Sequence, residues 1–143
     1  MRYVLLCPDD LLEHLAAGTT FPGDAPVYLV SRPALRGRLT RAGASVVAGD
    51  PTDPDAYRKA AKHHRGAVVA ATPKSRLARA VAAAREAFPD GPVLAVTDDG
   101  RAVPGATVVP LGALGESLIR PALDRACGRA RVERIREHFA AAE

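Results

Sequence analysis

The stretch Ser45-Val46-Val47-Ala48-Gly49-Asp50-Pro51-Thr52-Asp53-Pro54 decides the predicted fold of this chain. Its first four residues form a short apolar run that is typical of a buried strand, and Gly49-Asp50 predicts a turn. Asp53 is a good N-cap, and Pro54 suits the first position of a helix. The stretch therefore predicts a strand that turns directly into a helix.

The same alternation of strand and helix runs along the whole chain. The predicted strands are short and continuously apolar, which is typical of parallel strands covered by helices on both faces. We expect an α/β fold, a Rossmann-like doubly wound parallel sheet in the order 3-2-1-4-5-6 with a long C-terminal helix. Strands are predicted over 3–7, 27–30, 45–48, 66–71, 93–97 and 107–109, and helices over 9–17, 33–42, 54–64, 75–88 and 113–140.

Length and composition indicate one domain with an aliphatic core. The chain has 143 residues, 48% of them hydrophobic and 4% aromatic, with no Trp. We assign residues 1–111 to the core and residues 112–143 to a crossover or interaction helix of the same domain. The net charge of +4 is spread along the chain, so no nucleic-acid partner is predicted. No apolar run approaches a membrane span of about 18 residues, so we expect no membrane insertion and a cytoplasmic location.

The cysteines and histidines form no pattern that predicts a disulfide framework or a metal site. Cys7 and Cys127 are isolated in apolar segments, which favours two buried thiols. His63 and His64 are adjacent at a helix end, and adjacent side chains on a helix point in different directions. A solvated helix end explains the two histidines better than a metal site does.

The order of the elements and the local motifs resemble the TrkA-N family, the N-terminal domain of the regulators of potassium conductance. The most specific motif is Gly49-Asp50-Pro51-Thr52-Asp53-Pro54, which is similar to the family's usual Gly-Asp-Ala-Thr-Asp-Pro. The segment 67–72 resembles the family's fourth strand, and Val108-Val109-Pro110 before a helix resembles its sixth. The resemblance covers about residues 2–120.

The resemblance implies a cytoplasmic module of the NAD(P)-binding superfamily that senses a ligand and pairs with copies of itself. Its partner would be a potassium channel or transporter, or a subunit that supplies the family's C-terminal ligand domain. The same domain also occurs fused to other effectors, including phosphoesterases. The cofactor-binding positions that the resemblance implies are Ser31, Arg32, Gly49, Asp50 and Thr72.

Two of these positions have a second interpretation. At the end of the second strand, the family usually has an acid for the ribose hydroxyls, whereas this chain has Ser31-Arg32. Arg32 can accommodate a 2′-phosphate there. Alternatively, Ser31 is the N-cap of the following helix and Arg32 is a surface residue.

The chain departs from the family where the glycine-rich turn is expected. The family's Gly-x-Gly-x-x-Gly aligns with residues 7–12, which contain no glycine. Those glycines let backbone N–H groups approach a pyrophosphate. Here Pro8 has no backbone donor, and Asp9 and Asp10 place negative charge at that position. We therefore expect that a dinucleotide does not bind in the usual pose and that no cofactor is required.

The remaining polar motifs favour capping and turns over chemistry. Asp9-Asp10, Asp50 and Thr72 at strand ends are similar to the acidic pocket of a receiver domain, but Asp98-Asp99 stands where a receiver needs Lys. Lys74-Ser75 follows no glycine-rich loop and is not a P-loop. No nucleophile–base constellation has supporting context, so the chain is predicted not to be an enzyme.

Two functions remain open from the sequence. The first is a non-enzymatic regulatory and assembly module that forms a homodimer or higher oligomer through the helix over 75–88 and the terminal helix. The second is a nucleotide sensor that holds an adenine nucleotide or NAD(P) against Ser31, Arg32, Asp50 and Thr72. The terminal helix, with an apolar stripe that includes Leu123, either meets a partner or packs back on its own sheet.

Overall fold

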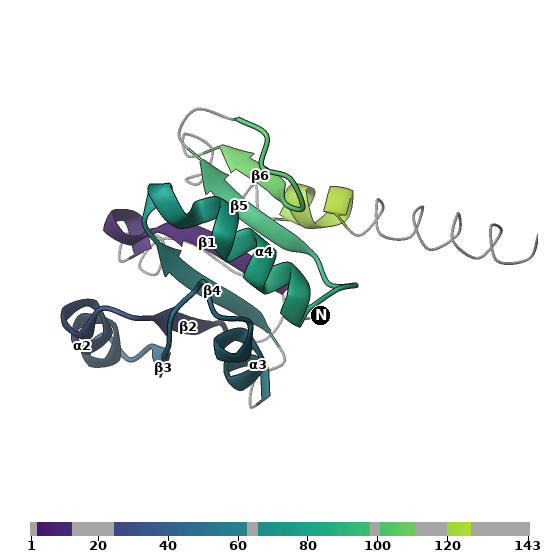
Figure 1. Cartoon of the computed structure of the whole chain (residues 1–143). Coiled ribbons are helices and arrows are strands. Elements are labelled where there is room, and N and C mark those ends of the chain that lie inside the picture. Colours follow the sequence, from purple (N-terminus) through teal and green to yellow (C-terminus); the bar gives the residue numbers. More distant parts are fainter. Residues whose placement is uncertain (1–2, 13–24, 63–65, 98–100, 111–119, 127–143) are drawn as a thin grey trace, which may run out of the picture.

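The structure, a computed structural model, describes residues 3–12, 25–62, 66–97, 101–110 and 120–126. Within these residues, six strands form one parallel sheet, and the predicted Rossmann-like α/β class is confirmed (Figure 1). The strands are β1 (Tyr3–Pro8), β2 (Val27–Val30), β3 (Ser45–Ala48), β4 (Ala67–Thr72), β5 (Val93–Thr97) and β6 (Thr107–Pro110).

The predicted order of these strands is wrong at the centre of the sheet. The order is β3-β2-β4-β1-β5-β6, so β1 and β4 have exchanged places relative to the prediction. β4 pairs with β2 and β1, and β1 lies between β4 and β5. Both strands are six residues long and buried along their whole length. Each therefore fits the apolar pattern of a central strand, and periodicity alone does not separate the two arrangements.

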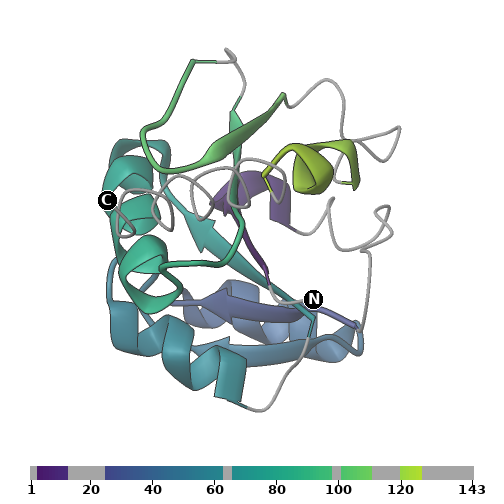
Figure 2. The ribbon, with the colours of Figure 1, turned by 90° about the vertical axis from the view of Figure 1, so that its right-hand side faces the viewer.

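Helices cover both faces of the sheet. α3 (Pro54–Lys62) and α4 (Leu77–Ala87) pack together on one face, and α2 (Pro33–Arg41) lies on the other. The helical segment 120–126 shares the face of α2, and Figure 2 shows it across the sheet from α4. Two 3₁₀ turns, η1 (Asp9–Leu11) and η2 (Lys74–Arg76), directly follow β1 and β4.

The core consists of two apolar layers that alternate along each strand. On β1, Tyr3, Leu5 and Cys7 belong to the layer under α2, whereas Val4 and Leu6 belong to the layer under α3 and α4. This alternation follows from the two-residue period of side chains on a strand. The same alternation shows on which face of the sheet the last side chain of each strand lies.

Gly43 directly follows Ala42, the C-cap residue of α2. It has a φ of 87°, a left-handed conformation that glycine adopts without strain. Its N–H donates to the Thr40 carbonyl at 3.0 Å, and the Ala44 N–H donates to the Leu39 carbonyl at 3.0 Å. This is the Schellman arrangement, which satisfies the last carbonyls of the helix.

Several sequence predictions fall partly or wholly outside the described residues. The helix predicted over 9–17 begins as the 3₁₀ turn η1, and residues 13–17 lie outside the described residues. Of the predicted terminal helix, 120–126 is helical, and Ala122, Leu123 and Ala126 are buried against the sheet, so this part packs on its own domain. Cys127, His63 and His64 lie outside the described residues.

A membrane span requires a long and apolar helix. None of the helices within the described ranges is long and apolar enough to cross a bilayer. The division of the chain into a core over 1–111 and a helix over 112–143 stays a prediction.

Candidate functional site

The turn over residues 49–54 is closed by hydrogen bonds within itself. One carboxylate oxygen of Asp50 accepts the Thr52 N–H at 2.9 Å and the Thr52 hydroxyl at 2.8 Å. Asp53 accepts the Asp55 N–H at 3.0 Å, which confirms Asp53 as the cap of α3. The two bonds from Thr52 hold the pKa of Asp50 below its usual value. The polar groups of the motif therefore serve to start α3.

Gly49 allows α3 to lie close to the sheet. A Cβ at this position would stand 2.9 Å from Leu29 Cδ1 of β2 and 3.0 Å from Ala56 Cβ of α3. Both distances are shorter than ordinary contacts between carbon atoms, and Ala56 is fixed to the helix backbone. Gly49 thus has a packing role in this structure.

Tyr57 joins the turn to α4. Its side chain is fully buried, and its hydroxyl donates to the Pro51 carbonyl at 2.6 Å. The same hydroxyl lies 3.5 Å from the Ala80 carbonyl of α4. Burial raises the pKa of Tyr57, and the nearby charge of Asp50 raises it further. The phenol is therefore a neutral donor that fixes the turn against the neighbouring helix.

The end of β2 departs from the prediction for Ser31. The N-cap of α2 is Arg32, with no side-chain capping bond, and the helix begins at Pro33. Proline suits that position because it needs no N–H there, and it moves the cap one residue beyond Ser31. Both Ser31 and Arg32 are exposed. An Arg32 guanidinium nitrogen lies 4.0 Å from a carboxylate oxygen of Asp9, across the end of β4.

The end of β1 is acidic and lacks a backbone donor. Pro8 closes the strand and is the N-cap of η1, whose first two residues are Asp9 and Asp10. The side chain of Asp9 is 16% exposed. Burial raises the pKa of Asp9, the Arg32 charge lowers it and the Asp10 charge raises it. The net effect is a raised pKa, which means that the surroundings of Asp9 disfavour its ionised form.

Three strand ends present side chains to the face that α4 covers. Pro8 of β1 pairs in register with Thr72 of β4, and Thr97 ends β5 on the other side of β1. By the alternation of the core, all three face the α4 layer. Thr72 and Thr97 are 1% and 7% exposed. Because neighbouring strands lie about 4.8 Å apart, the two threonines are separated by about 10 Å.

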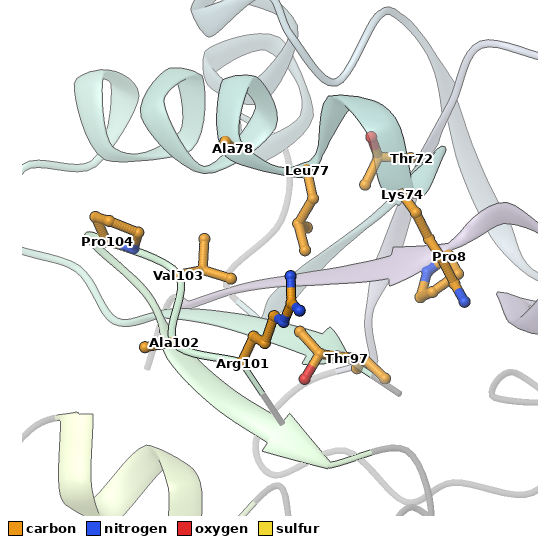
Figure 3. A pocket seen from close by; sticks show the side chains of 11 residues that line it. Pro8, Thr72, Lys74, Leu77, Ala78, Thr97, Arg101, Ala102, Val103 and Pro104 are labelled. Atoms are coloured by element: carbon orange, nitrogen blue, oxygen red, sulfur yellow. The ribbon is translucent and has the colours of Figure 1, made fainter. Parts of the chain in front are cut away.

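A pocket of about 320 Å³ lies over this row (Figure 3). Leu77 and Ala78 at the start of α4 form one side, and the segment 101–104 before β6 forms the other. Lys74 and Arg101 bring positive charge to it. The residues that line it are Pro8, Thr72, Lys74, Leu77, Ala78, Val96, Thr97, Arg101, Ala102, Val103 and Pro104.

The segment that carries Arg101 is fastened to α4. The Arg85 side chain donates to the Gly105 carbonyl at 3.1 Å through Nε and to the Gly91 carbonyl at 2.8 Å. Val103 packs against the core layer under α4. The Ala106 N–H closes a turn onto the Val103 carbonyl at 3.2 Å. The wall of the pocket is therefore held by contacts that need no ligand.

The pocket occupies a topological switch point of the sheet. The chain leaves β1 toward β2 on one side and leaves β5 toward β6 on the other, although β1 and β5 are neighbours. In open parallel sheets, ligands bind in the crevice outside the carboxyl ends of two strands whose connections diverge in this way. The predicted order did not place a switch point between β1 and β5.

Comparison with known families identifies the chain. The sequence profile of the TrkA-N domain matches residues 13–117, well over half of the chain. The chain belongs to the TrkA-N family. The matched residues begin after β1 and η1, so the predicted loss of the glycine turn at residues 7–12 is untested by the match. No curated protein matches the chain.

A solved structure agrees with the TrkA-N assignment at the level of the fold. The chain is similar to the NAD(P)-binding domain of an exopolyphosphatase-related protein from Archaeoglobus fulgidus, with a TM-score of 0.52 and 18% identity. The similarity covers 94% of this chain and 97% of that one. It supports a Rossmann-like fold for this TrkA-N domain over nearly its whole length.

The structure brings the predicted site residues of this TrkA-N domain to one edge but not to one pocket. Gly49 and Asp50 follow β3, Ser31 and Arg32 follow β2, and Thr72 ends β4, on three neighbouring strands. Of the five, Thr72 lines the pocket. Sequence reasoning missed Thr97, Lys74 and Arg101. The available signal was a threonine closing an apolar strand with a cation a few residues beyond, which occurs after both β4 and β5.

The described part of this TrkA-N chain holds no group of three His, Cys, Asp or Glu side chains placed to bind a metal ion. Cys7 is fully buried, and burial with the charges of Asp10 and Asp9 raises the pKa of its thiol to about 12. The predicted buried thiol is confirmed for Cys7. A protonated thiol is a weak nucleophile.

Proposed function

We propose that this chain is a non-catalytic regulatory and assembly module, of the kind that the TrkA-N family supplies to potassium transport systems in the cytoplasm. In this proposal the domain does not hold NAD in the usual dinucleotide pose. The observation that supports it is the end of β1, which consists of Pro8, Asp9 and Asp10 where the resemblance leads us to expect a glycine turn.

The chemistry of that turn opposes a pyrophosphate. A dinucleotide-binding sheet presents backbone N–H groups of a glycine turn and a helix N-terminus to the phosphates. Pro8 has no N–H, and Asp9 and Asp10 add two carboxylates. Two unit charges 4 Å apart repel by about 1 kcal/mol in water and about 4 kcal/mol near a protein surface. A Rossmann-like domain without the usual pyrophosphate-binding turn is best explained by a role in contacts with other proteins.

Titration calorimetry with NAD⁺ and NADH tests the first part of the proposal. We expect no saturable binding to the wild-type chain. The double variant Asp9→Asn/Asp10→Asn removes the charges and leaves Pro8 in place, so it separates charge repulsion from the missing donor. Tight NAD⁺ binding by the wild-type chain would contradict the proposal.

The outward face of α4 supports self-association. Ala78, Arg79, Ala82 and Glu86 are exposed there. Small side chains allow two helices to approach closely. In an antiparallel pair related by a two-fold axis, Arg79 of one copy would stand opposite Glu86 of the other. A homodimer through α4 is therefore our expectation for assembly, with a potassium channel, a transporter or a ligand-domain subunit as the further partner.

Sedimentation equilibrium of the full chain tests this expectation. We expect a concentration-dependent dimer that Ala82→Arg weakens by at least tenfold, because the longer cation prevents close approach. Ala34→Arg on α2 is the matched control, since Ala34 is also an exposed helical alanine but lies on the opposite face of the sheet. A strictly monomeric chain at high concentration would defeat the assembly proposal.

A further inference from the structure

We propose that the open edge of the sheet at β3 binds an acidic extended segment of a partner protein, which adds to the sheet as a further strand. Arg36 of α2 and Lys59 of α3 would meet its carboxylates from the two faces of the sheet. β3 contributes no residue to the pocket, and this surface is separate from the outward face of α4. The inference therefore goes beyond the proposed function and does not depend on it.

The backbone of β3 has one side that no strand covers among the described residues (Figure 1). The Gly49 N–H donates to the Val30 carbonyl of β2 at 3.3 Å, so the backbone at Gly49 points to β2. Because the backbone groups of successive strand residues point to alternate sides, Val47 also points its N–H and carbonyl to β2. Val46 and Ala48 therefore point theirs to the open side, where an added strand would pair with them.

The strand at this edge lacks the features that usually prevent pairing with another chain. Edge strands are commonly protected by a charged side chain, a proline or a bulge. The residues of β3 are Ser45, Val46, Val47 and Ala48, with no charge and no proline, whereas the opposite edge strand β6 ends in Pro110. Val46 and Val47 are half-buried and pack on opposite faces of the sheet, so an added strand would extend the cover of both.

The charge around this edge favours an acidic partner. Residues 25–62 hold seven Lys or Arg and three Asp, whereas the rest of the chain holds thirteen side chains of each sign. The excess positive charge of the chain thus lies in the segment that forms β2, α2, β3 and α3. Of its three acids, Asp50 and Asp53 accept hydrogen bonds in the turn. The third, Asp55, pairs with Arg58 at 2.6 Å.

Lys59 flanks the edge on the α3 face of the sheet. Ala56, one turn earlier in α3, lies beside the end of β3, because a Cβ on Gly49 would stand 3.0 Å from the Ala56 Cβ. Residues three positions apart are neighbours on one side of a helix, so Lys59 lies on the β3 side of α3. Its side chain is exposed and forms no ion pair within the described part of the chain.

Arg36 flanks the edge on the α2 face. Leu35 and Leu39 point to the core, and at about 100° per residue Arg36 lies about 80° to one side of their common direction. Strand–helix–strand crossovers in parallel sheets are almost always right-handed, and that hand places this side of α2 toward β3. The Nε of Arg36 is buried and has no hydrogen-bond partner among the described residues. A carboxylate from an added strand would satisfy it.

A second copy of this chain fits the edge less well. Two β3 strands paired antiparallel about a two-fold axis would place α2 beside α2 and α3 beside α3, and so bring like charges together. An acidic strand from another protein meets no such repulsion. Because successive side chains of a strand point to opposite faces, two consecutive Asp or Glu residues would reach Arg36 and Lys59, one each.

Fluorescence polarisation with labelled hexapeptides on the full chain tests the inference. We expect saturable binding of Thr-Val-Glu-Glu-Val-Thr and none of Thr-Val-Lys-Lys-Val-Thr. Two further glutamate peptides carry N-methyl groups, one on its second and fourth residues and the other on its third and fifth. Because only one side of the added backbone pairs with β3, one of these two should lose binding and the other should keep it. Attraction by charge alone would not distinguish them.

Variants of the chain test the two contributions from the other side. Ala48→Pro removes an N–H that points to the open side, where an edge strand tolerates proline, so peptide binding should fall at least tenfold while circular dichroism stays unchanged. Arg36→Gln and Lys59→Gln should weaken binding by about tenfold and about threefold, because Lys59 is the more exposed. Lys62→Gln changes another exposed lysine of α3 and is the matched control, with no effect expected.

Four results would each overturn the inference. Three of them are no binding of the glutamate peptide at millimolar concentration, equal binding of the two N-methyl peptides, and equal losses from Lys59→Gln and Lys62→Gln. The fourth is a dimer that Ala48→Pro dissociates, which would assign the edge to a second copy. Peptide binding is measured without NAD⁺ and does not require the α4 dimer. Its failure would therefore leave the proposed function standing, and tight NAD⁺ binding would overturn that function and leave the edge intact.

Discussion

The turn over residues 49–54 and the pocket over β1 lie at the same edge of one sheet, yet they use their polar groups in opposite ways. In the turn, Asp50 and Asp53 each accept hydrogen bonds from their own segment. In the pocket, the Thr97 hydroxyl is buried without a partner in the described part of the chain. A polar group that is satisfied by its own segment holds that segment in place, whereas an unpaired buried hydroxyl contributes no such bond.

The motif that is most recognisable in the sequence is therefore a turn that starts α3, and the pocket lies elsewhere along the same edge of the sheet. The comparison makes a simple division: substitutions in the turn should lower stability, and removal of the unpaired hydroxyl in the pocket should not. The first half of this division, extended to the acidic end of β1, predicts four stability changes of decreasing size.

Gly49→Ala should destabilise the protein by about 1–3 kcal/mol, because its Cβ would stand 3.0 Å from Ala56 Cβ and force α3 outward. Chemical denaturation measures the change. Gly37→Ala is the matched control within α2, where the added Cβ meets nothing closer than an Arg41 nitrogen at 3.9 Å. It should stabilise the protein by about 0.5–1 kcal/mol. Equal effects from the two variants would break the comparison.

Tyr57→Phe should destabilise the protein by about 1–2 kcal/mol, because it leaves the Pro51 carbonyl without its donor at 2.6 Å. Tyr3→Phe is the control, since the buried Tyr3 hydroxyl has no partner within the described residues. Its removal should be neutral or slightly stabilising. Melting temperatures of the two variants, recorded side by side, check the contrast. A neutral Tyr57→Phe would show that the turn does not depend on α4.

Asp50→Ala should cost about 0.5–1.5 kcal/mol near neutral pH, because both bonds from Thr52 are lost. The pKa of Asp50 is lowered in the folded state, so its contribution is fully present above the unfolded value near 3.8 and is lost as the pH falls through the lower folded value. Denaturation of wild type and variant from pH 7 to pH 2 should show the difference shrinking. A difference that does not change with pH contradicts this account.

Asp9→Asn should give the smallest effect, a slight rise in melting temperature near pH 7. The pKa of Asp9 is raised mainly by burial, so the ionised form disfavours the folded state at neutral pH. Stability attributed to this group is present below the unfolded pKa and is lost as the pH rises through the folded one. The gain from the variant should therefore vanish on acidification. A melting temperature that falls at pH 7 would mean that the contact with Arg32 outweighs the burial.

Much of the fold could be predicted from the sequence because each element carries its own local signal. The strand over 45–48 and the Asp53 cap are local features, and the structure confirms both. The predicted burial of that strand is wrong, because β3 lies at the edge of the sheet and its residues are exposed or half-buried. The strand order was not predictable in this way. β1 and β4 are both buried throughout, and which of them neighbours β2 depends on contacts between distant parts of the chain.

The candidate site was less predictable for a related reason. Thr72 was found because it resembles a family position, but Thr97 and Arg101 become neighbours of Lys74 only through the pairing of β1 with both β4 and β5. Ser31 was assigned to the wrong position at the start of α2 because Pro33 decides where that helix begins. Residues that act through one local contact are readable in a sequence, and residues that meet across a sheet are not.

The central position of β1 in the sheet has a consequence for how the chain folds during synthesis. β1 ends at Pro8, but its two pairing partners begin at Ala67 and Val93. During synthesis, β2 and β3 emerge and can pair with each other long before β1 has a neighbour. The first strand of this sheet to be synthesised thus has to wait for β4 before it can pair, and without it the sheet would separate into β3-β2-β4 and β5-β6.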